Sequence, residues 1–110
     1  MAMPIESKRV AGGTAVMVLS GRLVMGRELE QLDTTVQSLL AQGDRRFVLD
    51  ATGLEYLDSA AIGALVAALS LVKKAGGDLR LAGASPRIQR VFSMTGVDKL
   101  IPAFPTVAEA

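Results

Sequence analysis

The stretch YLDSAAIGALVAAL, from Tyr56 to Leu69, decides the fold because it joins a strand-like run to a helix. Its apolar residues, together with Val72 beyond its end, recur at spacings of three and four along an almost uncharged segment. That spacing predicts one helix face that packs on a sheet, formed by Ile62, Leu65, Val66, Leu69 and Val72. The helix should run from about Ser59 to Lys74, where Gly76-Gly77 ends it.

Strand and helix patterns alternate on both sides of this stretch. We expect strands around 5–10, 14–19, 46–51 and 78–83, helices from about Glu28 to Gln42 and from Pro86 through Met94, and a short last helix at 107–110 capped by Thr106. Ala11 to Gly13 should form the turn of an opening hairpin, and 52–58 should form a loop. The sequence therefore predicts an α/β fold with a mixed, mostly parallel sheet of four to five strands and about four helices. We expect a single domain over residues 1–110.

Composition argues against several classes of function. The 110 residues include no Cys and no His, which removes disulfides, the commonest general base and the usual zinc ligands. A net charge of +1 and a lack of aromatic platforms give no reason to expect nucleic acid binding. Because no secretory signal or membrane-spanning run is visible, we expect a cytoplasmic protein without membrane insertion. Glu55 and Asp58 are the only carboxylates that the sequence brings together, on one expected loop, and we interpret them as solvated charges. We therefore predict no enzyme activity, no metal and no cofactor.

Ser59 stands where the expected helix begins and allows two interpretations. Ser is a preferred N-cap, yet Asp58 can cap the same helix. A hydroxyl at a helix N-terminus also suits phosphorylation, because the added charge meets unpaired backbone N–H groups. The small residues Ser59, Gly63, Ala67 and Ser70 share another helix face, which accommodates a neighbouring helix, receives a partner, or does both.

Four segments in order resemble one known family. They are GRL at 21–23, FVLDATGLEYLDSAAIGALVAAL at 47–69, GGDLRLAGASPRIQRVF at 76–92 and TGVDKLIPAF at 95–104. Together they resemble the STAS domain of bacterial anti-sigma factor antagonists. The resemblance implies that Ser59 is phosphorylated by an anti-sigma factor that is also a serine kinase. The unmodified protein would bind that factor and free the sigma factor, the phosphorylated form would release it, and a phosphoserine phosphatase would reset the cycle.

The expected docking surface contains Ser59 with Asp58, Glu55, Ile62 and Gly63. Arg87 and Arg90 share a face of the following helix, which is either a solvated face or an edge of the docking surface. Of the two, we assign Arg87 to the docking surface. Weak nucleotide binding is not specified by any residue pattern.

The chain departs from the family pattern at three positions. Val24 replaces an Asp that family members usually carry near the phosphoserine, and Ala60 and Ala61 stand where the family has Ser or Thr and then Gly. These changes bear on whether Ser59 is a kinase substrate. The alternative function is a docking subunit of a membrane transport system, such as a lipid-transport ABC complex, that works without phosphorylation.

Overall fold

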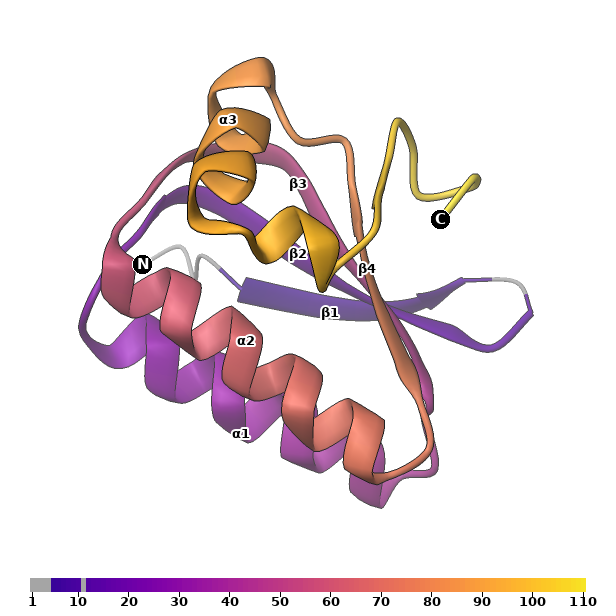
Figure 1. The fold of residues 1–110 in the computed structure, drawn as a ribbon. Coiled ribbons are helices and arrows are strands. Elements are labelled where there is room, and N and C mark those ends of the chain that lie inside the picture. Colours follow the sequence, from indigo (N-terminus) through magenta and orange to yellow (C-terminus); the bar gives the residue numbers. More distant parts are fainter. Residues whose placement is uncertain (1–4, 11) are drawn as a thin grey trace.

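Among the residues that the structure describes, five strands pair in the order in which they occur along the chain and form one sheet (Figure 1). The computed structural model describes residues 5–10 and 12–110. β1 (Ile5–Val10) is antiparallel to β2 (Thr14–Leu23). β3 (Arg46–Leu57), β4 (Asp78–Ala82) and β5 (Ala103–Phe104) continue the sheet in parallel from β2. The expected mixed, mostly parallel sheet of four to five strands is confirmed.

The opening hairpin also forms as predicted. Gly12 and Gly13 have φ angles of 89° and 81°, and the amide of Gly13 donates to the carbonyl of Val10. Positive φ favours glycine, which explains the residue choice at this turn. Ala11, the first residue of the predicted turn, lies outside the described residues.

In the described part of the chain, three α-helices and one 3₁₀ turn connect or follow the strands: α1 (Arg27–Ala41), α2 (Ser59–Lys74), α3 (Pro86–Thr95) and η1 (Val97–Lys99). The last predicted helix, at 107–110, is wrong, because these residues form a turn in which the Ala110 amide donates to the Thr106 carbonyl. So short a segment cannot repay the cost of nucleating a helix. Thr106 still accepts a hydrogen bond from the Glu109 amide at 3.3 Å, as a cap would.

All three α-helices pack on the same face of the sheet. Their buried side chains join alternate residues of the strands in one core, which includes Met17, Leu32, Val36, Phe47, Leu49, Leu65, Val72, Leu81, Ile88 and Phe92. Figure 1 shows α1 and α2 side by side beneath this face. On the outer face a smaller apolar cluster of Val16, Val48 and Ala82 is covered in part by Val107 and Ala110.

β3 is longer than the sequence predicted and extends to Leu57. The predicted loop at 52–58 is therefore wrong for residues 52–57, which belong to the strand. The β2–β3 register shifts twice, between Val18 and Ser20 and between Gly21 and Arg22, and each shift gives β3 an extra residue. The buried residues of this part of β3 are therefore three apart: Ala51, Leu54 and Leu57. A bulged strand loses the two-residue alternation by which strands are identified.

Candidate functional site

Ser59 is the first residue of α2 and its side chain is exposed. Its hydroxyl makes no hydrogen bond with any side chain or backbone group of residues 5–10 and 12–110. Asp58 is the N-cap instead, because its Oδ1 accepts a hydrogen bond from the Ala61 amide at 2.8 Å. Of the two caps that the sequence allowed, the structure uses Asp58, which leaves Ser59 without a structural role in the cap.

The second carboxylate oxygen of Asp58 holds the loop between β2 and α1. Oδ2 accepts from the backbone amide of Met25 at 3.0 Å, and the Asp58 amide donates to the Leu23 carbonyl at 3.3 Å. The amides of Met25 and Ala61 lower the pKa of the Asp58 carboxyl below its ordinary value, because they stabilise its charged form. Asp58 is consequently an ionised carboxylate at neutral pH, directly beside Ser59.

The small-residue face of α2 is open. Ser59, Gly63, Ala67 and Ser70 are all exposed, and a Cβ built on Gly63 would meet nothing within 4 Å. In the described part of the chain no neighbouring helix covers this face, so the intradomain packing explanation is wrong. Small exposed side chains at helical spacing let another molecule approach the helix backbone closely.

The other residues expected in the first turn of α2 are divided between core and surface. Ala61 is fully buried and Ala60 is half-buried. Ile62 is partly buried and packs against the core, so only part of its side chain is available to a partner. Val24, the residue at the departure from the family pattern in the β2–α1 loop, is half-buried next to the loop residue that Asp58 holds.

Glu55 and Arg87 lie together in a different place. Both line an open groove of 600 Å³ between β3 and the start of α3, together with Thr52, Gly53, Leu54, Ser85 and Pro86. Ser59 does not line this groove. Glu55 and Arg87 are exposed, and Arg90 is exposed as well, whereas Ile88 between them faces the core. The groove forms a second part of the surface near the carboxyl end of β3.

Two exposed apolar side chains near Ser59 were missed in the sequence. Met25 is 76% exposed in the loop held by Asp58, and Tyr56 is 43% exposed near the end of β3. The guanidinium carbon of Arg22 lies 4.6 Å from the centre of the Tyr56 ring, which is a cation–π contact. The only sequence signal for a role of Met25 was its position directly after the GRLV segment. The hydrogen bond that joins it to Asp58 could not be predicted, because the two residues are 33 positions apart.

Among the described residues no group of three or more carboxylates comes close enough to hold a metal ion. In residues 5–10 and 12–110 no helix has both the length and the apolar character needed to cross a membrane.

A family model of the STAS domain matches residues 7–110. The chain belongs to the STAS domain family. The match includes every strand and helix of the described structure except the first two residues of β1. The family resemblance seen in the sequence is therefore confirmed.

Curated relatives of this STAS domain carry names that refer to sigma-factor control. The anti-sigma F factor antagonist of Paenibacillus polymyxa is 24% identical over 101 residues, covering 89% of this chain and 84% of the relative. The anti-sigma-B factor antagonist of Bacillus subtilis is 40% identical over 48 residues, 44% of each chain. A relative from Thermotoga neapolitana is 31% identical over 71 residues, and the match spans 63% of that relative's length.

Solved structures share the fold of this STAS domain. The phosphorylated form of SpoIIAA, a Bacillus cell fate determinant, superposes with a TM-score of 0.73 at 22% identity, covering 96% of this chain and 94% of SpoIIAA. A sulfate transporter family protein from Wolinella succinogenes superposes with a TM-score of 0.81 at 20% identity, covering 94% of this chain and 85% of that one. At these identities the similarity establishes the fold alone.

Proposed function

We propose that this STAS domain is an anti-sigma factor antagonist that acts by binding, without catalysis, and that phosphorylation of Ser59 controls the binding. The observation that carries the proposal is an exposed serine, free of hydrogen bonds within the described chain, beside an ionised Asp58 and an open small-residue face. The relatives named as antagonists of anti-sigma factors support the class of partner.

The unmodified domain binds an anti-sigma factor that is also a serine kinase. Gly63 and the other small residues of α2 let the partner approach the helix, while Met25 and the exposed part of Ile62 supply apolar contact. Glu55 and Arg87 extend the surface along the adjoining groove. Binding of this factor sets its sigma factor free.

Phosphorylation of Ser59 ends the complex. The phosphate adds a charge of about −1.5 to −2 next to the carboxylate of Asp58, so a partner that closes over Ser59 must bury two like charges. The same phosphate sits at the positive end of the α2 dipole, which stabilises it in the free domain. A shift from 99% to 1% occupancy requires about 5.5 kcal/mol of differential binding. A phosphoserine phosphatase then restores the binding form.

Ser59→Asp tests the proposal by placing a negative charge at this position. We expect its affinity for the anti-sigma factor, measured by isothermal titration calorimetry, to fall at least tenfold, about 1.4 kcal/mol. The free energy of unfolding should change by about 0.5 kcal/mol or less because the side chain is exposed. Ser93→Asp, on the exposed side of α3, is the matched control and should leave binding unchanged. Unchanged binding by Ser59→Asp would refute the switch.

Mass spectrometry of the protein isolated from its native cells tests the partner. A phosphate on the Ser59 peptide, together with a copurifying kinase-type anti-sigma factor, is the expected result. An unmodified Ser59 under all growth and stress conditions, with a transporter ATPase bound, would establish the transport-docking alternative instead. The departures at Val24, Ala60 and Ala61 make this measurement informative, because they lie around the serine.

A further inference from the structure

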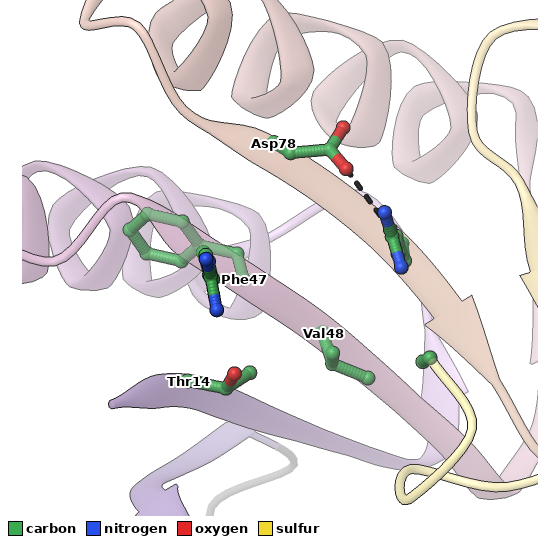
Figure 2. Close-up of a pocket in the computed structure, with 7 residues that line it drawn as sticks. Thr14, Phe47, Val48 and Asp78 are labelled. Atoms are coloured by element: carbon green, nitrogen blue, oxygen red, sulfur yellow. Dashed lines mark hydrogen bonds and ion pairs between the residues drawn. The ribbon is translucent and has the colours of Figure 1, made fainter. Parts of the chain in front are cut away.

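A pocket of 240 Å³ lies on the outer face of the sheet, at the end where β2, β3 and β4 begin. It is lined by Thr14, Arg46, Phe47, Val48, Asp78, Arg80 and Ala110. Figure 2 shows Thr14, Val48 and Asp78 on three neighbouring strands around the opening. Ser59 follows the other end of β3, so this pocket is separate from the candidate docking site.

Cationic side chains outnumber carboxylate side chains around the pocket. The β3–β4 register places Arg46 opposite Asp78 and Val48 opposite Arg80. Asp78 is nevertheless engaged elsewhere, because Oδ2 accepts from Nε of Arg80 at 2.9 Å and Oδ1 accepts from Nζ of Lys73 at 3.2 Å. Within residues 5–10 and 12–110 the guanidinium of Arg46 has no carboxylate partner. Around the pocket the side chains of Lys73, Arg46 and Arg80 therefore carry three positive charges against the one side-chain carboxylate of Asp78.

The donors that remain suit an oxyanion. Nε of Arg80 donates to Asp78. The guanidinium of Arg80 also makes a cation–π contact with the Phe104 ring, whose centre lies 5.3 Å from Cζ. The two Nη groups of Arg80, the guanidinium of Arg46 and the hydroxyl of Thr14 make no hydrogen bond with other residues of the described chain. A guanidinium presents several N–H groups in a planar fork that matches the oxygens of a phosphate.

We propose that this pocket binds the phosphate group of a small ligand, which Arg46 and Arg80 hold from two adjacent strands while Thr14 donates a further hydrogen bond. The pocket is smaller than the roughly 300–1,000 Å³ of sites for drug-sized ligands, so it fits a small phosphate compound or the phosphate alone. Val48 provides an apolar wall that limits water around the bound anion. This inference does not depend on phosphorylation of Ser59.

Titration of isotope-labelled protein with inorganic phosphate tests the site. Ionic strength is held constant with sodium chloride, and backbone amide shifts are followed by NMR. We expect saturable shifts centred on Thr14, Arg46 and Arg80. Arg46→Gln and Arg80→Gln should each weaken phosphate binding about tenfold or more, because each removes hydrogen bonds from a charged donor. Thr14→Val, which keeps the shape of the side chain, should weaken it less.

Arg87→Gln is the matched control, because Arg87 is an exposed arginine that lines a different groove. It should bind phosphate as the unmodified protein does, and so should Ser59→Ala. Unfolding curves of each variant show whether the fold is intact, and Arg46→Gln is the safest variant because Arg46 is exposed. Shifts that do not saturate, or that persist unchanged in Arg46→Gln, would overturn the proposal.

Discussion

Asp58 supports two parts of the candidate site with one carboxylate. One oxygen caps α2 at the Ala61 amide, and the other holds the Met25 amide of the β2–α1 loop. Because Met25 is the most exposed apolar residue near Ser59, the position of this loop affects what a partner meets there. Asp58 therefore positions the surface around Ser59 as well as contributing charge to it.

Asp58→Asn hardly changes the size of the side chain and should weaken both of its hydrogen bonds. The amide side chain has only one acceptor oxygen, so its NH₂ group must face either the Met25 or the Ala61 amide. We expect the melting temperature to fall by a few degrees and the Met25 amide to exchange its hydrogen faster. Circular dichroism and NMR hydrogen exchange measure these two effects. Asp98→Asn, at an exposed carboxylate of η1, is the control, and equal effects of both substitutions would contradict the dual role of Asp58.

Acid should destabilise the domain through its engaged carboxylates. Asp44 is buried and accepts from Nε and Nη2 of Arg9 at 3.0 and 2.6 Å, and this contact lowers the pKa of the Asp44 carboxyl. The pKa of Asp58 is lowered by its backbone amide donors. Both carboxyls thus contribute stability that is complete above their unfolded pKa of about 3.9 and is lost as the pH falls through the lower folded values.

Urea unfolding at a series of pH values checks this prediction. We expect these two groups to leave stability constant between about pH 6 and pH 7, and to reduce it below about pH 4. Asp44→Asn should lower the free energy of unfolding by about 1 kcal/mol at neutral pH and make the acid loss smaller. An acid slope that is unaltered by Asp44→Asn would show that this ion pair does not contribute.

At the scale of the element, α2 has two faces with different roles. Leu65, Leu69 and Val72 are buried against the sheet, which anchors the helix. Gly63 lies on the opposite, exposed face, where glycine lowers helix stability without relieving any steric conflict. A glycine that the fold does not need is consistent with close approach by a partner.

Gly63→Ala separates stability from binding. We expect the free energy of unfolding to rise by about 0.5–1 kcal/mol, because alanine is the better helix former and its Cβ meets nothing within 4 Å. We also expect weaker binding to the anti-sigma factor, measured by calorimetry, since the added methyl group obstructs close packing. Gly77→Ala should instead destabilise, because its Cβ would overlap the backbone oxygen of Arg45. Full binding by Gly63→Ala would remove this face from the interface.

At the scale of the whole molecule, one core joins all three α-helices to the sheet. Leu65 of α2 and Phe92 of α3 belong to the same buried cluster, although they come from helices at different positions along β3 and β4. A shared core of this kind predicts a single cooperative unit, as expected of one domain over the described chain.

Leu65→Ala and Phe92→Ala test this unity. Each should lower the free energy of unfolding by about 2–5 kcal/mol and shift the entire transition. Urea unfolding followed both by circular dichroism and by fluorescence of Tyr56, the single tyrosine, should give coincident curves. Two separate transitions, with each substitution affecting only one of them, would contradict a single domain.

The sequence by itself determined the elements whose patterns are local. Helical spacing located α2 and Leu65, Leu69 and Val72 on its buried face, although Ile62 and Val66 of the predicted face are only partly buried. Turn glycines located the hairpin, and the join at Asp58 and Ser59 located the candidate switch. These features depend on residues within a few positions of one another, so their preferences are visible along the chain.

Only the tertiary structure decided the features that depend on distant contacts. The bulges that lengthen β3 arise from its pairing with β2, and the bond from Met25 to Asp58 joins residues 33 positions apart. The exposure of Gly63 and the position of Arg46 and Arg80 at one pocket follow from how helices and strands pack. Such contacts form only when the sheet brings separate segments together, because no local preference specifies strand register or the neighbour of a helix face.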